Sequence, residues 1–344
     1  MGYNSYKEIS ESYIQIKETI NTMKNYKDEI INFFDNNSDI VLLGCGSSYW
    51  SILSAGQSLR SHTKRKVYTF KATEISLSKK EYLNCFTNPV FVIPSRSGES
   101  KELIDSLIYF KEVYPTAKIF SITEFVNNTL TGMSNLNISI PFAEEISVCQ
   151  TRSFNCLYTS LICVVSFLSD ENIINDLNDY LSNAKNYYND AESKVITLVE
   201  KFNDSEIVAL GSGIQYGAVI EGAYIIMEMA QYVTNYFQVL EYRHGPVVTA
   251  NEKTIVFITS TRKENLKIEC KMASEIKKAG SKIVFIGTEQ EVDEGILSFT
   301  IKPYCEEVRA LYSVMILQHF AYYLAIKLGK NPDKPGDLVK YITY

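Results

Sequence analysis

The chain has 344 residues and a formal net charge of −6, with 46% hydrophobic and 22% charged residues. These values are typical of a globular protein long enough for two domains of ordinary size. The acidic balance argues against a nucleic-acid-binding surface. The first residues have no signal-peptide core, and the longest apolar run, residues 157–168, is too short to span a bilayer.

The cysteines give information on the cellular compartment and on metals. There are seven of them, with no CxxC pair and no nearby histidine that would indicate a zinc site. An odd number of unpatterned cysteines favours reduced thiols. We therefore expect a cytoplasmic protein with no metal and no cofactor.

The first predicted ligand loop follows an N-terminal helical segment over residues 5–35. An apolar strand at residues 41–43 leads into Gly-Cys-Gly-Ser-Ser at 44–48, and a helix follows from Tyr49. The loop lacks the third glycine of the dinucleotide fingerprint and the lysine of a P-loop. Glycines with paired hydroxyls suit a monophosphate better than a nucleotide.

A second loop has similar chemistry. Residues 90–93 are apolar, residues 94–100 read Pro-Ser-Arg-Ser-Gly-Glu-Ser, and residues 103–110 are amphipathic, which predicts strand, turn and helix. Three hydroxyls, a glycine and the free N–H groups of a helix start favour one bound phosphate. Taken alone, the loop could also be an ordinary turn with serine caps. In a doubly wound sheet, both loops would line one crevice.

The two halves of the chain repeat each other, which predicts a tandem duplication. Each half alternates strands and helices, so the predicted fold class is α/β with two doubly wound, mostly parallel sheets flanked by helices. In the second half, residues 260–265 lack the glycine and the hydroxyl pattern, so we expect one phosphate site per chain, in the first half. The paired segments are residues 41–46 and 208–213, 90–95 and 255–260, and 117–123 and 281–287.

Three further segments carry candidate catalytic residues. A helix predicted from about Tyr216 to Val233 places Glu221 and Glu228 on one face, and each carboxylate is either solvated or a desolvated base with a raised pKa. His244 precedes a Gly-Pro turn and could be a simple surface residue. The final ten residues would ordinarily be a frayed end.

These motifs together resemble the sugar isomerase (SIS) family, in Gly-Cys-Gly-Ser-Ser at 44–48, Ser-Arg-Ser-Gly-Glu-Ser at 95–100 and residues 145–154. The resemblance runs from about Ile9 to the last residue. It includes the isomerase half of glucosamine-6-phosphate synthase, the aminosugar-phosphate isomerase/deaminases and the fructosamine-6-phosphate deglycases. It implies a first SIS domain with the N-terminal helix at residues 1–170, a connecting helix at 171–203 and a second SIS domain at 204–344.

The resemblance also implies roles for individual residues. Glu228 would move a proton between the first two sugar carbons, with Glu221 as an assisting group. His244 would open the sugar ring in the active site of a neighbouring subunit, which implies a homodimer with shared sites. Lys340 would meet the open-chain carbonyl. The phosphate- and substrate-binding residues would be Ser47, Ser48, Ser95, Arg96, Ser97, Ser100, Val148 and Gln150.

The chain departs from the synthase at three points. Ile225 stands where the synthase helix has a lysine, Arg96 stands where it has a glutamine, and no glutaminase domain is expected. We therefore expect a phosphosugar isomerase acting on a hexose 6-phosphate or aminosugar 6-phosphate, with deamination or deglycation and without glutaminase activity. The alternative is a non-catalytic sugar-phosphate-binding regulator. A third interpretation, an arabinose- or hexulose-phosphate isomerase, is weaker because those relatives have a single domain.

Overall fold

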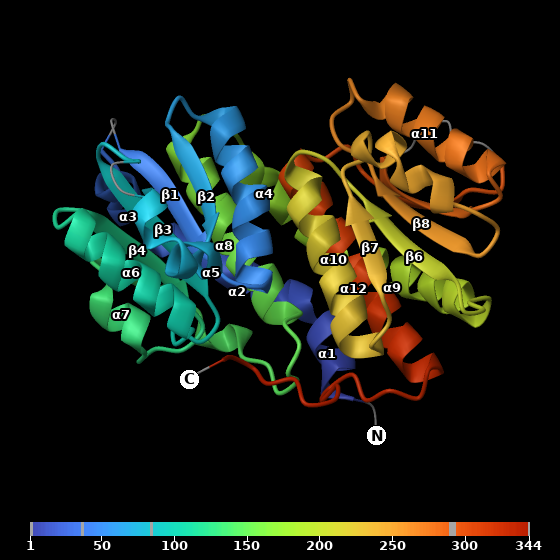
Figure 1. Cartoon of the computed structure of the whole chain (residues 1–344), viewed down its shortest axis with the longest axis horizontal. Coiled ribbons are helices and arrows are strands. Elements are labelled where there is room, and N and C mark those ends of the chain that lie inside the picture. Colours follow the sequence, from blue (N-terminus) through green and yellow to red (C-terminus); the bar gives the residue numbers. More distant parts are fainter. Residues whose placement is uncertain (1–2, 36–37, 83–84, 289–293, 343–344) are drawn as a thin grey trace. The chain divides into compact units, whose positions relative to one another are not determined.

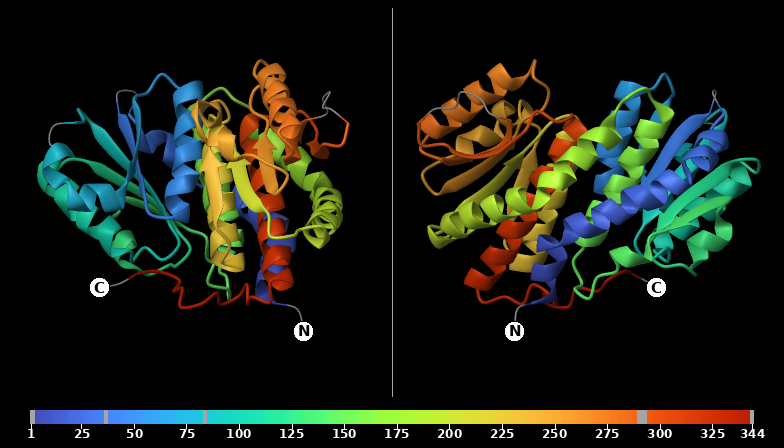
Figure 2. Two further views of the ribbon diagram at one scale, coloured as in Figure 1. Left: turned by 45° about the vertical axis from the view of Figure 1, so that its right-hand side comes forward. Right: turned by 180° about the vertical axis from the view of Figure 1, so that it is seen from behind.

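Two compact α/β units make up the chain in a computed structural model that describes residues 3–35, 38–82, 85–288 and 294–342. Each unit contains one five-stranded parallel sheet. Figures 1 and 2 show helices on both sides of each sheet. The predicted fold class is thereby confirmed. Within these ranges, no helix combines the length and apolar character needed to cross a membrane.

The first sheet has the strand order β2-β1-β3-β4-β5, and every neighbouring pair is parallel. Parallel neighbours require a crossover connection, which helices provide here. The order reverses direction between β1 and β3, and ligands of such sheets bind outside the carboxyl ends of the strands at this point. The strands are β1 (Asp39–Gly44), β2 (Val67–Lys71), β3 (Pro89–Ser95), β4 (Lys118–Thr123) and β5 (Leu136–Ser139).

Alternating side chains bury both faces of the first sheet. Val41 and Leu43 pack into one core cluster with Leu107 of α6, whereas Ile40 and Leu42 are buried on the opposite face. This period of two follows from the pleat of a strand. The helices of the unit are α2 (Ser12–Asn25), α3 (Lys27–Phe33), α4 (Ser47–His62), α5 (Ala72–Leu77), α6 (Lys101–Val113), α7 (Thr129–Met133) and α8 (Arg152–Leu168).

The second sheet has the order β10-β9-β8-β6-β7, which is the same winding in the second repeat. Its strands are β6 (Glu206–Leu210), β7 (Thr234–Phe237), β8 (Thr254–Thr259), β9 (Lys282–Thr288) and β10 (Leu297–Ile301). Its helices are α1 (Asn4–Ser10), α9 (Ile173–Glu200), α10 (Ile214–Ala230), α11 (Leu266–Lys278) and α12 (Glu306–Lys327).

Strand register agrees with the predicted duplication. Ile40 pairs with Val90 in the first sheet, and Ile207 pairs with Ile255 in the second. Val90 in turn pairs with Lys118, as Ile255 pairs with Lys282. The segments that repeat in sequence are therefore the segments that pair in the same register.

The two units exchange their chain ends, which the sequence did not indicate. The first-repeat unit consists of Glu11–Ile146, Gln150–Ile174 and Val339–Tyr344, so the C-terminal tail belongs to it. Helix α1 belongs to the second-repeat unit, where the backbone N–H of Ser5 donates to Asp333 Oδ1 at 2.8 Å. The predicted N-terminal helical segment is also divided, into α1, α2 and α3.

Candidate active site

The loop after β1 forms the first part of the predicted phosphate cradle. Gly46 has a φ of +52°, and α4 begins directly after it at Ser47. Ser47 and Ser48 are buried. A Cβ on Gly44 would lie 2.9 Å from the backbone of Ser48, so the turn requires glycine there. The first N–H groups of α4 have no partner within the helix, and together with these hydroxyls they suit a compact anion.

The loop after β3 forms the second part. Its own backbone uses two serine hydroxyl oxygens as acceptors: Gly98 N–H donates to Ser95 Oγ at 3.0 Å, and Glu99 N–H donates to Ser97 Oγ at 3.1 Å. The hydroxyl protons remain able to donate to a ligand. Ser100 precedes α6 but makes no side-chain capping hydrogen bond. The loop is therefore a tight turn whose hydroxyls are held in place.

Gly98 fixes the shape of this second loop. Its φ is +67°, and a Cβ added to it would lie 2.0 Å from Asn128 Oδ1. The neighbouring Glu99 carboxylate accepts hydrogen bonds from Thr129 N–H and the Thr129 hydroxyl, each at 2.7 Å. The loop after β4 thus braces the cradle, and only glycine fits between them.

Glu145 organises the loop before α8. Its buried carboxylate accepts from Thr151 N–H at 2.7 Å, the Thr151 hydroxyl at 2.6 Å and Arg152 N–H at 2.6 Å. A carboxylate at a helix N-terminus is stabilised by the free N–H groups and by the helix dipole. Gln150, a predicted substrate residue, is half-buried, and its Oε1 has no hydrogen-bond partner among the described residues. Val148 belongs to the other unit, where its N–H donates to Asp333 O at 2.9 Å.

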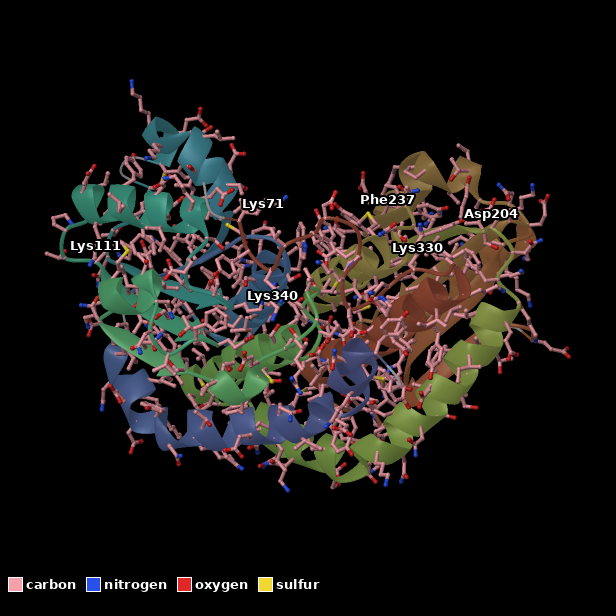
Figure 3. The ribbon with its side chains drawn as sticks, turned by 90° about the horizontal axis from the view of Figure 1, so that it is seen from below. Lys71, Lys111, Asp204, Phe237, Lys330 and Lys340 are labelled. Carbon is pink, nitrogen blue, oxygen red and sulfur yellow. The ribbon has the colours of Figure 1, made fainter. Side chains whose placement is uncertain are left out.

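The C-terminal tail brings Lys340 to the Arg96 side chain of the cradle. Buried Arg96 donates from Nη2 to the Lys340 carbonyl, and its Nη1 lies 3.9 Å from Glu145 Oε2. Lys340 Nζ donates to the Glu145 carbonyl. Figure 3 labels Lys340, which is half-buried. Two residues that the sequence placed in different predicted domains are therefore neighbours within one unit.

Glu124 is a site residue that the sequence reasoning missed. It follows β4 directly, its N–H donates to Arg96 O at 3.2 Å, and it is 2% exposed. Burial and, to a smaller extent, the nearby Glu145 raise its pKa to about 8, against the opposing effects of Arg96 and Lys340. Glu124 Oε2 has no hydrogen-bond partner within the described residues. An acid directly after a parallel strand, at the edge where ligands bind, was the available signal.

The raised pKa of Glu124 predicts a specific pH dependence of stability. Between about pH 4.5 and 8 the folded chain keeps a proton that the unfolded chain has lost, so the free energy of unfolding falls as the pH rises. We expect Glu124→Gln to reduce this slope. Above pH 8 the variant should be more stable than the wild type by at least about 1.4 kcal/mol, the equivalent of one pKa unit.

Denaturant unfolding from pH 5 to 9 tests this expectation. The matched control is Glu112→Gln, an exposed glutamate on α6 of the same unit, which should leave the pH profile unchanged. If Glu124→Gln and the wild type have superimposable profiles, Glu124 is ionised throughout this range and the buried proton is absent.

The predicted catalytic carboxylates lie on α10, in the second-repeat unit. Glu221 is fully buried and Glu228 is half-buried. Both carboxylates raise the pKa of Tyr224, after the larger effect of burial, so the three side chains share one region of the helix. A Cβ on Gly222 would lie 2.2 Å from Leu317 Cδ1, which shows how closely α10 packs on α12 beside Glu221. Ile225 is fully buried.

His244 ends the short 3-10 helix Glu241–His244 and is exposed. Of the two histidines expected to be structural, His319 is buried with Nδ1 2.9 Å from Met315 O, and His62 lies 3.3 Å from Glu171. The cradle, Arg96 and Lys340 thus belong to one unit, and Glu221, Glu228 and His244 belong to the other. Across the described ranges, no group of His, Cys, Asp and Glu side chains is arranged to hold a metal ion.

Sequence comparison identifies the first repeat. Residues 33–169 match the family model of the SIS domain. This part of the chain is a SIS domain. The resemblance inferred from the loop motifs is confirmed, and the SIS match covers β1 to α8 together with both cradle loops.

Relatives that match most of the chain are named as isomerizing aminotransferases. Glutamine–fructose-6-phosphate aminotransferase (isomerizing) of Sulfolobus acidocaldarius is 28% identical over 98% of this chain and 56% of its own length. The Bacillus subtilis enzyme of the same name is 26% identical over 88% of this chain and 51% of its own length. The chain thus spans about half the length of these relatives.

Solved structures share the complete fold. Tagatose-6-phosphate ketose/aldose isomerase from Escherichia coli has a TM-score of 0.86 at 19% identity, covering 98% of this chain and 96% of its own. Glucosamine-6-phosphate deaminase from Thermotoga maritima has a TM-score of 0.80 at 21% identity, covering 99% and 100%. At these identities the likeness shows the fold alone, which is that of two tandem SIS repeats.

Proposed function

We propose that this protein is a phosphosugar isomerase that acts on a hexose 6-phosphate or aminosugar 6-phosphate and releases ammonia or an amine. The observation that carries the proposal is the pair of serine loops at the carboxyl ends of β1 and β3, on either side of the switch point of the sheet. Buried Arg96 adds a fixed positive charge beside these hydroxyls. The named relatives act on sugar 6-phosphates, which is consistent with this chemistry.

The proposed reaction begins with a phosphate anchored by the serine hydroxyls and by the first N–H groups of α4 and α6. Anchoring one end of a sugar orients its other end, so that the reacting carbons need not be found by diffusion. His244, supplied by a second copy of the chain, opens the ring by proton transfer. Glu228 then moves a proton between C1 and C2 as general base and acid, and Glu221 supports it from the same helix face.

Lys340 is proposed to act on the open-chain carbonyl. Its Nζ lies at the cradle, where it donates to the Glu145 carbonyl, and the same residue receives the Arg96 hydrogen bond. A substrate carbonyl could replace the Glu145 carbonyl as acceptor. An amine in that place polarises a carbonyl by hydrogen bonding and, once deprotonated, can form a Schiff base with it.

Binding of phosphorylated sugars tests the cradle. We expect Ser97→Ala to weaken the binding of fructose 6-phosphate roughly tenfold or more, because a lost hydrogen bond to a charged group costs roughly 1.5 kcal/mol or more. Isothermal titration calorimetry measures this, with Ser182→Ala, an exposed serine on α9, as the control. Fructose without phosphate should bind far more weakly. Equal affinity for fructose and fructose 6-phosphate would exclude a phosphate cradle.

The alternative function is that of a sugar-phosphate-binding regulator. It would use the same cradle as the proposed enzyme but would not convert the bound sugar. Glu228, His244 and Lys340 favour an enzyme, because binding alone needs none of these groups. Incubating the chain with a panel of aminosugar and aminoacyl-sugar phosphates, and assaying ammonia and ketose phosphate, separates the two. Binding without product from any member of the panel would favour the regulator.

A further inference from the structure

The second-repeat unit contains a cavity that none of the proposed chemistry uses. Its volume is about 740 Å³, and it lies at the carboxyl ends of β8, β9 and β10. The described lining residues include the cations Arg262, Lys263, Lys302 and Arg309 and no aspartate or glutamate. The whole chain has more acidic than basic residues, 40 against 34. A cavity lined by four cations in an acidic protein points to an anionic ligand.

Arg309 is built into the wall of this cavity. Its side chain on α12 is 9% exposed. Its Nε donates to Tyr304 O at 3.2 Å, and its Nη1 donates to Ser260 O at 3.2 Å and to Ser260 Oγ at 3.0 Å. Nη2 makes no hydrogen bond to a described residue, so the guanidinium is held rigidly with one nitrogen left to donate. Arginine held in this way presents a fixed fork to an oxyanion.

Nearby carboxylates compensate this positive charge only in part. Lys302 is paired with Asp179 at 3.0 Å, and Arg262 Nε lies 3.5 Å from Glu306 Oε2. Lys263 and Arg309 make no ion pair with a described carboxylate. Burial raises the pKa of Glu306 to about 7, which leaves this acid only partly ionised at neutral pH.

A second buried acid beside the cavity, Glu269, accepts hydrogen bonds from the protein. The Glu269 carboxylate accepts hydrogen bonds from Thr261 N–H at 3.1 Å and from the Thr261 hydroxyl, and burial raises its pKa. Glu269 therefore shapes the turn after β8, and it also interacts electrostatically with Arg309.

The cavity also has room and surface for an organic group. Its volume is within the roughly 300–1,000 Å³ of small-molecule sites and exceeds what inorganic phosphate alone would fill. Tyr187, Leu266, Ile301 and Tyr304 contribute aromatic and apolar wall. No histidine and no carboxylate is among the described lining residues, so the site can bind a ligand but has no evident general base.

We propose that this cavity is a second ligand site, for a phosphomonoester that carries a ring, such as a sugar phosphate or a nucleoside monophosphate. Strand register supports its position: Ser260 follows β8 in the second repeat where Ser95 ends β3 in the first. Each repeat therefore has a possible ligand site at the carboxyl ends of its strands, lined by serines in the first repeat and by cations in the second. This departs from the expectation of one phosphate site per chain, and it does not depend on the proposed isomerase activity.

Titration calorimetry of the full chain with fructose 6-phosphate, adenosine 5′-monophosphate and inorganic phosphate tests the proposal. The background variant is Ser95→Ala/Ser97→Ala, which weakens the serine cradle and leaves the second cavity intact. In this background we expect at least one of the two organic phosphates to bind, and to bind more tightly than inorganic phosphate. Which of them binds identifies the organic part of the ligand.

Charge reversal then locates the binding. Arg262→Glu/Lys263→Glu should weaken it roughly tenfold or more, as expected when charge-assisted hydrogen bonds are lost. Lys267→Glu/Lys271→Glu makes the same change in net charge on α11, outside the lining of the cavity, and should leave the affinity unchanged. Thermal unfolding checks that all variants remain folded.

Two results would overturn the proposal: no phosphate probe binds to the cradle variant, or binding responds equally to both charge reversals. These results differ from a failure of the proposed function. That function fails if no sugar phosphate is turned over by the wild-type chain, whatever the cavity of the second repeat binds.

Discussion

Glu228→Gln is expected to lower the turnover of a phosphosugar substrate by roughly a hundredfold or more, the usual contribution of a positioned acid or base. Glutamine retains the shape of the side chain but cannot accept the proton from C1 or C2. Because the serine loops, and not Glu228, are proposed to hold the phosphate, fructose 6-phosphate should bind the variant with close to wild-type affinity. The measurement is a comparison of kcat with the calorimetric Kd for one verified substrate.

The matched control is Glu275→Gln, a glutamate on α11 that pairs with Lys271 on the surface, and it should keep wild-type turnover. Full activity of Glu228→Gln would remove this helix face from the mechanism. A proportional loss of binding and turnover would instead indicate that Glu228 contacts the substrate without transferring a proton.

Subunit sharing can be tested with the same variant. Glu228→Gln and His244→Ala chains should each be inactive alone. If His244 serves the site of a neighbouring copy, a mixture of the two contains hybrid dimers in which one site has both wild-type residues. We expect part of the activity to return on mixing. Full activity from a chain that sedimentation shows to be monomeric would rule out the shared site.

Local sequence patterns were sufficient to predict most of the fold. Strands of a parallel sheet are buried on both faces, so they appear in the sequence as short apolar runs. Such runs of four to six residues, each followed by a small-residue turn and an amphipathic run, predict alternating strands and helices. The repeat of residues 41–46 at 208–213 predicted a duplication, and the pairs of Ile40 with Val90 and of Ile207 with Ile255 show the same register in both sheets. Local pattern and global topology agree in these segments.

Features that depend on contacts distant in sequence were not predictable in this way. The acid Glu124 gains its raised pKa from burial beside Glu145, which is twenty-one positions further along the chain. The cavity around Arg309 combines the end of β8 with residues from α9, β10 and α12. The segment after β8 shows Arg262 and Lys263 in the sequence, but it gives no sign that Lys302 and Arg309 lie beside them. Only the packing of distant segments brings such groups together.

The C-terminal tail makes contacts in the structure that its local sequence pattern does not predict. Residues 335–344 have no strong secondary-structure pattern, and such ends are usually frayed. In the structure, Lys340 instead makes two hydrogen bonds to groups at the cradle, one through its carbonyl to Arg96 and one through Nζ to the Glu145 carbonyl. We propose that the tail completes the active site and covers it during turnover.

Deleting residues 339–344 is therefore expected to lower turnover by roughly a hundredfold or more and to leave the unit folded. Two hydrogen bonds of ordinary strength contribute only about 1–3 kcal/mol to stability, and the core of the first sheet contains none of the tail. Steady-state kinetics and thermal unfolding on the same preparation separate loss of function from loss of fold. Unimpaired turnover after truncation would exclude the tail from the mechanism.

Single substitutions distinguish the backbone of the tail from its amine. Lys340→Ala removes Nζ but keeps the carbonyl that accepts from Arg96, so the tail should stay in place while turnover falls. Lys334→Ala, at an exposed tail position, is the control. If Lys340 forms a Schiff base, borohydride with substrate should attach the sugar to the C-terminal peptide, as mass spectrometry would detect. If the peptide is unlabelled and Lys340→Ala is inactive, the Lys340 amine is required but forms no covalent bond to the sugar. Its role would then be to donate a hydrogen bond to the substrate carbonyl.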